Sequence, residues 1–148
     1  MTATPTDYSD TALCIWKEAR GEGVQGMTAV ACVIRNRVEK RGTSYSVEVY
    51  RAWQFTSMSV PTDPEFHLVP SGFDPTWDAA QQIADDVING KTADVTGGAV
   101  LYWNPAGIAS DKTFTTLSGQ VVKFPHTWNA SVVRESVQIG HHIFLVEV

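Results

Sequence analysis

The sequence predicts a mainly helical α+β domain, and two observations support this class. Apolar residues recur with a helical period over residues 7–88, whereas short alternating runs follow Gly97-Gly98. Helices first and strands later are typical of a domain in which helices and sheet are segregated. A chain of 148 residues has the usual length of one domain, so we expect residues 1–148 to form a single domain.

Two long helices are expected near the start of the chain. The first covers about residues 7–20 and has one apolar face, formed by Tyr8, Ala12, Ile15, Trp16 and Ala19. The second covers about residues 24–41 and is apolar almost all round over residues 29–34, which indicates a buried helix. Its basic last turn is followed by Gly42, a common helix stop.

Further helices and strands follow in order. A short helix is expected over residues 45–52, and a longer one begins after Asp74 as N-cap, has Pro75 at its first position and ends at Asn89-Gly90. Residues 99–103 read as a strand, residues 112–124 as a hairpin turning at Ser118-Gly119, and residues 143–148 as a closing strand.

Charge and hydropathy exclude several classes of protein. The net charge is −5 and no basic run is present, so we expect no nucleic-acid partner and no stable membrane association. The longest apolar run, residues 29–34, is far shorter than the roughly 20 residues of a membrane span. The first ten residues lack the basic and apolar regions of a signal peptide. We expect a monomer.

The cysteines and histidines do not suggest a metal site. Cys14 and Cys32 both lie in expected helices, which favours free buried thiols over a single disulfide or a catalytic thiolate. The four histidines lack metal-ligand spacing: His67, His126, His141 and His142. We therefore expect no metal and no cofactor.

Glu18 is the first candidate for chemistry. It falls in the last turn of the first helix, roughly 100° from the centre of the apolar face, at the border between core and solvent. Burial against the second helix would raise the pKa of this carboxyl, as a general acid requires. Glu22 lies one turn further on and could raise it more. The alternative is that both are ordinary exposed charges.

The same segment resembles a known family. Residues 18–22 read EARGE and residues 26–38 read GMTAVACVIRNRV, which is similar to the opening signature of the SleB-type cell wall hydrolases, a family of spore cortex-lytic enzymes and phage endolysins. The resemblance continues through QFT at 54–56, LYWNP at 101–105 and IGHHIF at 139–144. It implies a lysozyme-like, lytic transglycosylase-like fold, with a helical lobe and a small β-rich lobe around a groove.

The resemblance also implies roles for residues. Glu18 matches the catalytic glutamate, with Glu22, Thr56 and Tyr102 as supporting residues. Thr56 stands where the family usually has serine, and its hydroxyl is expected near the acid; the alternative is a bond to its own backbone. Aromatic faces stack on sugar rings and amides bind N-acetyl groups, so five residues are expected to bind substrate: Gln54, Phe55, Trp103, Asn104 and Trp128. Core packing by the tryptophans and a turn at Asn104 are the alternatives.

The favoured function is cleavage of the N-acetylmuramic acid–N-acetylglucosamine bond of bacterial peptidoglycan. No second carboxylate in a motif stands ready as nucleophile, which favours a lytic transglycosylase. The alternatives are a hydrolysing muramidase and a non-catalytic peptidoglycan-binding module. A phage endolysin is the expected biological context, held in the host cytoplasm until a holin releases it to the cell wall.

Overall fold

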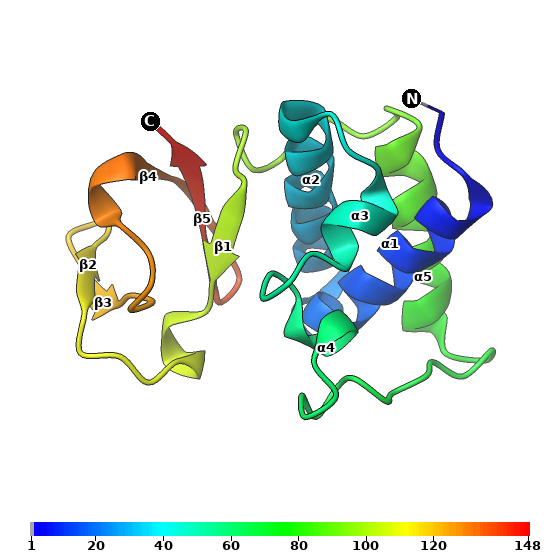
Figure 1. Cartoon of the computed structure of the whole chain (residues 1–148), viewed down its shortest axis with the longest axis horizontal. Coiled ribbons are helices and arrows are strands. Elements are labelled where there is room, and N and C mark those ends of the chain that lie inside the picture. Colours follow the sequence, from blue (N-terminus) through cyan, green and yellow to red (C-terminus); the bar gives the residue numbers. More distant parts are fainter. Residues whose placement is uncertain (1) are drawn as a thin grey trace. The chain divides into compact units, whose positions relative to one another are not determined.

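The computed structural model describes residues 2–148, which form two compact units that divide between Val95 and Thr96. The first unit holds the helices and the second holds the strands, as Figure 1 shows by the labels. The α+β class predicted from the sequence is confirmed.

The first unit contains five α-helices and one 3₁₀ turn among its described residues. They are α1 (Pro5–Ala19), η1 (Arg20–Glu22), α2 (Gly23–Arg41), α3 (Tyr45–Val49), α4 (Thr56–Ser59) and α5 (Pro75–Ile88). Helices α1, α2 and α5 pack against one another, and α3 and α4 pack against α1 (Figure 1). The core between them is apolar, with Ile15, Val30, Val33, Ile34 and Val87 fully buried.

Helix α1 begins two residues earlier than the sequence predicted. Thr4 is the N-cap: its hydroxyl accepts the backbone N–H of Asp7, and the Asp7 carboxylate accepts the backbone N–H of Thr4. This reciprocal pair is a capping box, and Pro5 at the first position has no N–H that needs a partner. Local hydrogen bonding therefore places the start at Pro5, ahead of the first residue of the apolar face.

Helices α2 and α5 follow the prediction closely. Helix α2 ends at Arg41, and the C-cap Gly42 adopts the left-handed conformation with φ 65°. Helix α5 begins after Asp74, whose side chain accepts the backbone N–H of Thr76. Helix α2 is buried along most of residues 26–34, as its nearly continuous apolar character predicted.

Helix α3 is shorter than predicted because a buried carboxylate organises its last residues. Glu48 is fully buried and accepts hydrogen bonds from Arg41, Thr43 and Arg51. The chain leaves the helix at Tyr50 and turns, and Trp53 in that turn has φ 65°. The short helix α4 was not predicted, since four residues are too few to show a period.

The second unit contains two antiparallel sheets. One has the order β1-β5-β4, from β1 (Leu101–Trp103), β4 (Val133–Ile139) and β5 (His142–Glu147). The other pairs β2 (Thr113–Thr115) with β3 (Val121–Lys123). The predicted turn at Ser118-Gly119 closes this hairpin, with Gly119 at φ 90°. Single 3₁₀ turns lie at η2 (Pro105–Gly107) and η3 (Ala130–Val132).

Strand β4 is the strand that the sequence did not predict. Its pairing with β5 contains an irregularity between Glu135 and Val137, so the alternation of apolar and polar residues is interrupted. Glu135 is buried, although a charged residue is normally expected on the exposed face of a strand. Both features interrupt the period-two alternation of apolar and polar residues by which a strand is predicted.

An aromatic cluster forms the core of the second unit. Trp103, Phe124, Ile143 and Leu145 are buried together. The Trp103 and Phe124 rings meet edge to face with centroids 5.3 Å apart, and Phe114 stacks on Phe124 at 5.0 Å. The Trp103 indole N–H donates to the carbonyl oxygen of Lys123 at 2.7 Å, so its polar atom is satisfied inside the core.

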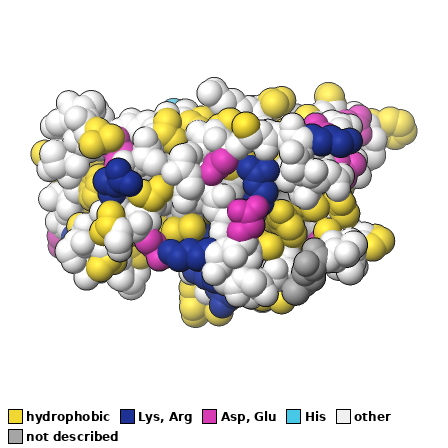
Figure 2. Space-filling model, turned by 90° about the horizontal axis from the view of Figure 1, so that it is seen from above, with side chains coloured by type: hydrophobic (Ala, Val, Ile, Leu, Met, Phe, Trp, Pro, Cys, Tyr) yellow, Lys and Arg dark blue, Asp and Glu magenta, His cyan; other side chains and the backbone are white. Residues whose placement is uncertain are grey.

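Two surface properties bear on partners. No helix in the described part of the chain is long and apolar enough to cross a membrane. On the face shown in Figure 2, Lys and Arg side chains lie among Asp and Glu side chains, without a continuous basic area.

Candidate active site

Glu18 lies in the last turn of α1 and is half-buried, as its place at the border of the apolar face predicted. Its Oε2 atom accepts a hydrogen bond of 2.7 Å from the hydroxyl of Ser57 in α4. Ser57 is buried at 1% exposure. The carboxylate is therefore held by a second element and does not simply extend into solvent.

Lys17, the residue before Glu18, is buried and forms hydrogen bonds from α1 to α4 and to the loop that follows α4. Its ammonium donates to the carbonyl oxygens of Ser57 at 3.3 Å and Phe66 at 2.7 Å. Burial lowers the pKa of Lys17, because a charged ammonium is disfavoured away from water. The two carbonyl oxygens offset that cost in part.

Arg20 pairs with a carboxylate that the sequence did not single out. Its guanidinium contacts both oxygens of Glu65 at 2.9 Å, and lies 4.4 Å from the centre of the Trp16 ring. The Trp16 indole N–H in turn donates to Asp74 at 3.1 Å. Arg20 therefore holds the loop at Glu65.

The hydroxyl of Thr56 does not lie on Glu18. It donates to Oδ2 of Asp63 at 2.6 Å, and the backbone N–H of Glu65 donates to the other oxygen of Asp63 at 2.8 Å. The expected hydroxyl beside the acid is supplied by the next residue, Ser57. The reason is helical geometry, since adjacent residues of α4 point about 100° apart and only one can face α1.

Phe55 and Gln54 are placed differently from the expectation of direct substrate contacts. Phe55 has no exposed surface, and the Arg37 guanidinium lies 5.1 Å from its ring centre. A side chain without exposed surface cannot stack on a sugar in this conformation, so the assignment of Phe55 to substrate binding is corrected to core packing. Gln54 is half-buried, and its role stays a prediction.

Glu22 is half-buried and packs on a glycine of α2. A Cβ atom on Gly26 would lie 2.3 Å from the Cβ of Glu22, far inside contact distance. Glycine at this position therefore lets the Glu22 side chain lie against the helix. Its supporting role stays a prediction.

Of the expected residues in the second unit, Trp103 is corrected. It is 5% exposed and belongs to the aromatic core, so its ring faces have no access to a ligand. The side chain of Asn104 accepts the backbone N–H of Ala106 and starts the turn η2, which is the alternative considered from the sequence.

Tyr102 and Trp128 remain candidates for substrate contacts. Tyr102 is half-buried, and its ring centre lies 4.8 Å from that of His142 and 5.6 Å from that of Phe144. Trp128 is half-buried against Trp103, with ring centres 6.1 Å apart. Both side chains keep part of their surface accessible, and their roles stay predictions.

Neither cysteine suits nucleophilic chemistry. Both are free and buried, as the sequence favoured. Burial raises the pKa of the Cys14 thiol well above its usual value, and the nearby Glu18 charge adds to the effect. Within residues 2–148, no group of three or more His, Cys, Asp or Glu side chains is arranged to hold a metal ion.

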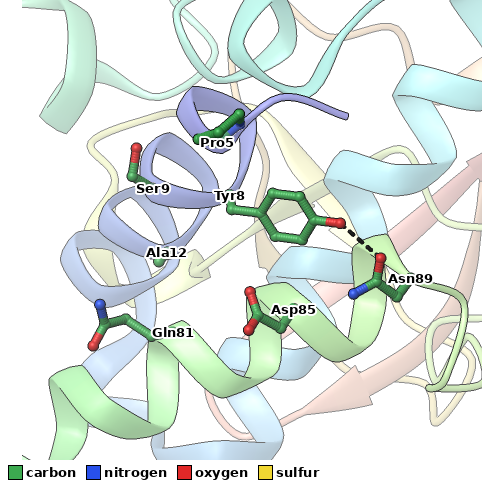
Figure 3. Close-up of a pocket in the computed structure, with 7 residues that line it drawn as sticks. All are labelled: Pro5, Tyr8, Ser9, Ala12, Gln81, Asp85 and Asn89. Carbon is green, nitrogen blue, oxygen red and sulfur yellow. Dashed lines mark hydrogen bonds between the residues drawn. The ribbon is translucent and has the colours of Figure 1, made fainter. Parts of the chain in front are cut away.

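A separate hollow of about 520 Å³ lies on the first unit, lined by the start of α1 and the end of α5. Figure 3 shows Tyr8 pointing across it, with its hydroxyl donating to the Asn89 side chain at 2.6 Å. Glu18 is not among its lining residues, and most of them are exposed. The hollow is therefore distinct from the candidate acid.

Comparison with known proteins identifies the family. The model of a family described as Cell Wall Hydrolase matches residues 21–145, which is most of the chain. The chain belongs to this family of cell wall hydrolases. The match begins just after Glu18 and includes Glu22, Gln54 and all the expected residues of the second unit.

Spore cortex-lytic enzymes are among the similar proteins. The chain is 29% identical to the enzyme of Halalkalibacterium halodurans over 97% of its own length and 37% of the relative's. It is 32% identical to the enzyme of Bacillus cereus over 70% of its own length and 39% of the relative's. The chain thus spans about two fifths of the length of these curated relatives.

Two solved structures share the fold. The catalytic domain of the germination-specific lytic transglycosylase SleB from Bacillus anthracis matches with a TM-score of 0.67 and 28% identity, covering 97% of this chain and 96% of that one. The catalytic domain of the Bacillus cereus SleB protein matches with a TM-score of 0.66 and 28% identity, covering 98% and 93%. The predicted lysozyme-like fold class is confirmed by these matches.

Sequence reasoning missed four residues around Glu18: Lys17, Ser57, Asp63 and Glu65. Lys17 could have been noticed from its position, because it lies next to the apolar face of α1. A lysine that is buried there must find hydrogen-bond acceptors. Asp63 and Glu65 lie in a loop and belong to no motif that would mark them. Ser57 carried no signal, since its contact with Glu18 joins residues 39 positions apart.

Proposed function

We propose that this cell wall hydrolase cleaves the glycosidic bond between N-acetylmuramic acid and N-acetylglucosamine in peptidoglycan, with Glu18 as the acid and base. One observation carries the proposal: Glu18 is a half-buried carboxylate held at 2.7 Å by the buried hydroxyl of Ser57. A general acid must be positioned and partly shielded from water, and Glu18 meets both conditions. The family and the two SleB catalytic domains support the substrate class.

The chemistry needs a proton donor because the oxygen of a glycosidic bond is a poor leaving group. Protonated Glu18 donates to that oxygen while the C1–O bond breaks, and the sugar ring takes on oxocarbenium character. The Glu18 carboxylate then removes a proton from the group that attacks C1. One residue serves both steps, as microscopic reversibility allows.

The attacking group is proposed to be the 6-hydroxyl of muramic acid itself. Its oxygen forms a new bond to C1 and its proton passes to Glu18, which closes a 1,6-anhydro ring without water. In the first unit, the carboxylates of the loop after α4 already have structural partners: Asp63 binds Thr56 and the Glu65 N–H, and Glu65 binds Arg20. These bonds disfavour either as a nucleophile, which supports a lytic transglycosylase over a hydrolysing muramidase.

The experiment that tests the acid is Glu18→Gln, assayed by the loss of turbidity of purified peptidoglycan sacculi. The amide is nearly isosteric but cannot donate the proton, so we expect the rate to fall by a factor on the order of 10²–10⁴. Circular dichroism checks that the fold is kept. Glu22→Gln is the paired variant, and we expect a smaller effect. A Glu18→Gln protein that clears sacculi at the wild-type rate rules Glu18 out as the acid.

The products distinguish the two kinds of glycosidase. Fragments ending in 1,6-anhydromuramic acid have no reducing end, whereas hydrolysis gives fragments that are one water heavier and reducing. Mass spectrometry of digested sacculi therefore decides between them. Mainly reducing muramic ends would support the muramidase and leave Glu18 as the acid.

A non-catalytic binding module is the second candidate. It is favoured only if purified protein sediments with sacculi but releases no soluble fragments. We also propose peptidoglycan glycan strands as the sole macromolecular partner of a monomeric protein, which light scattering and sedimentation with sacculi test together.

We further propose a phage endolysin that accumulates in the host cytoplasm and reaches the wall after holin action. The relatives described above are spore cortex-lytic enzymes, and the SleB-type family that the sequence resembles also includes phage endolysins. Expression in a Gram-negative host with and without a co-expressed holin tests it. Lysis that is independent of the holin would contradict the proposed route.

A further inference from the structure

Two consecutive residues of α1 hold a single residue of α4. Glu18 accepts the hydroxyl hydrogen of Ser57 at 2.7 Å, and Lys17 donates to the carbonyl oxygen of the same Ser57 at 3.3 Å. Ser57 is 1% exposed and Lys17 is 7% exposed, so the Lys17–Ser57 contact is buried, whereas the Ser57–Glu18 contact is partly buried because Glu18 is half-buried. Side chain and backbone of Ser57 are therefore fixed at once.

Lys17 also connects Ser57 to the far end of the loop. The same ammonium donates to the carbonyl oxygen of Phe66 at 2.7 Å, and lies 5.6 Å from the centre of the Phe66 ring. Removing the ammonium would leave two carbonyl oxygens without this donor in a buried place. Lys17 thus holds α4 and residue 66 against the last turn of α1.

The hydroxyl of Ser57 acts on the protonation of Glu18. A hydrogen bond donated to a carboxylate stabilises the charged form, whereas burial favours the neutral form. The titratable and charged groups on the surrounding elements include Cys14, Lys17, Arg20, Glu22, Arg37, Asp63 and Glu65. Lys17 contacts the carbonyl oxygen of Ser57, the residue whose hydroxyl donates to Glu18, so the Lys17–Ser57 pair is placed to orient the acid.

We infer that Ser57 is a positioning residue for Glu18, and that Lys17 acts on the acid by holding Ser57 in place. This inference rests on the proposed function of Glu18 and adds two residues that the family resemblance did not mark. Ser57 orients the carboxylate and stabilises it after it has given up its proton. Ser57 acts on the reaction through the Glu18 carboxylate.

The first test is Ser57→Ala, which removes one oxygen atom and leaves the packing of α4 almost unchanged. We expect the pKa of Glu18 to rise by about 1, because a hydrogen bond to a charged group is lost. Carbon-13 NMR titration of the glutamate carboxyl groups measures it, with Glu18→Gln identifying the resonance. This readout does not depend on activity.

The same variant is then assayed on sacculi as a function of pH. We expect the rate at the optimum to fall by roughly tenfold to a hundredfold, since the acid is less well aligned. The alkaline limb of the pH profile moves upward by about one pH unit, in step with the NMR titration. Ser57→Thr, which keeps the hydroxyl, restores the position of the limb.

The matched control is Ser59→Ala in the same helix. The Ser59 hydroxyl donates to the carbonyl oxygen of Phe55 at 3.2 Å. We expect this variant to leave the pKa of Glu18 and the alkaline limb unchanged. A general loosening of α4 would instead give the same result in Ser57→Ala and Ser59→Ala.

Lys17 is tested with Lys17→Met, alone and combined with Ser57→Ala. If Lys17 acts through Ser57, the double variant has the same Glu18 pKa as Ser57→Ala alone, because Lys17 has no further effect once the Ser57 hydroxyl is absent. Additive shifts would show that Lys17 acts on Glu18 by its charge and overturn that half of the inference. An unchanged pKa of Glu18 in Ser57→Ala overturns the whole inference, while inactivity of the wild-type protein on sacculi overturns only the proposed function.

Discussion

Glu22 lies directly against Gly26, one helical turn ahead of it: a Cβ added to Gly26 would come within 2.3 Å of the Glu22 Cβ. A contact this short cannot be accommodated without moving the backbone of η1 or α2. Gly26→Ala is therefore expected to destabilise the protein by about 1–3 kcal/mol, the usual cost of overpacking. Urea unfolding measures the change.

Gly21 is the matched control for this substitution. It lies in the same 3₁₀ turn as Glu22, and a Cβ on it would meet nothing within 4 Å. Gly21→Ala should leave stability within about 0.5 kcal/mol of the wild type. Equal losses in both variants would mean that the glycines matter for backbone conformation and not for the space beside Glu22.

The buried carboxylate of Glu48 is expected to make the folded protein less stable at acidic pH. Burial alone would raise its pKa, but hydrogen bonds from Arg51, Thr43 and Arg41 lower it from 4.5 to about 2. A carboxyl with a depressed folded-state pKa stabilises the protein above its unfolded pKa and loses that contribution as pH falls toward the folded value. We expect the free energy of unfolding to drop by about 2–3 kcal/mol between pH 5 and pH 2 from this residue.

Glu48→Gln isolates this contribution. The variant removes the charge and leaves two arginines without their buried partner, so we expect it to cost about 3 kcal/mol or more at pH 7. Its unfolding free energy should fall less steeply than that of the wild type below pH 5. Parallel pH curves for the two proteins would show that other carboxyls cause the acid sensitivity.

Trp53 adopts a backbone conformation that favours glycine or asparagine. Its φ is 65°, and its side chain is 78% exposed, so little packing compensates the strain. Trp53→Asn should raise the free energy of unfolding by about 1 kcal/mol, as measured in urea. Phe73→Asn is the control, because Phe73 is 97% exposed and has no such φ. A Trp53→Asn protein that is less stable than wild type would show that the ring makes stabilising contacts.

The two cysteines should be unreactive in the folded protein. Burial raises the pKa of both thiols, so the thiolate that alkylating reagents require is scarce. We expect iodoacetamide to modify Cys14 and Cys32 only after unfolding, and activity on sacculi to survive treatment of the native protein. Mass spectrometry counts the modified sites. Rapid alkylation of the native protein with loss of activity would contradict this expectation and would indicate that a cysteine thiolate takes part in catalysis.

Much of the helical unit could be predicted because its signals are local. The period of apolar residues marks α1, α2 and α5, and the stops at Gly42 and Asn89-Gly90 are set by conformations that few residues adopt. The half-buried position of Glu18 follows from the same period. Helix α1 begins at Pro5, earlier than predicted, and even this start depends on a local feature, the capping box between Thr4 and Asp7.

The residues around Glu18 could not be predicted in the same way. Ser57 and Thr56 are adjacent and both carry a hydroxyl, yet one bonds Glu18 and the other bonds Asp63. Which of them faces α1 depends on how α4 docks. Phe55 and Trp103 likewise have the composition of sugar-stacking residues but are buried, because aromatic rings serve core packing equally well.

The sequence by itself determined the α+β class, the family, the three long helices and the placement of an acid at the edge of the apolar face of α1. Helical period, caps and a long contiguous motif are properties of neighbouring residues, so they can be read before the chain folds. Only the tertiary structure decided that Ser57 holds Glu18, that Lys17 holds Ser57, and that Arg20 pairs with Glu65. These contacts join residues about 40 or more positions apart, and their partners are selected by packing and by the need to satisfy buried polar groups.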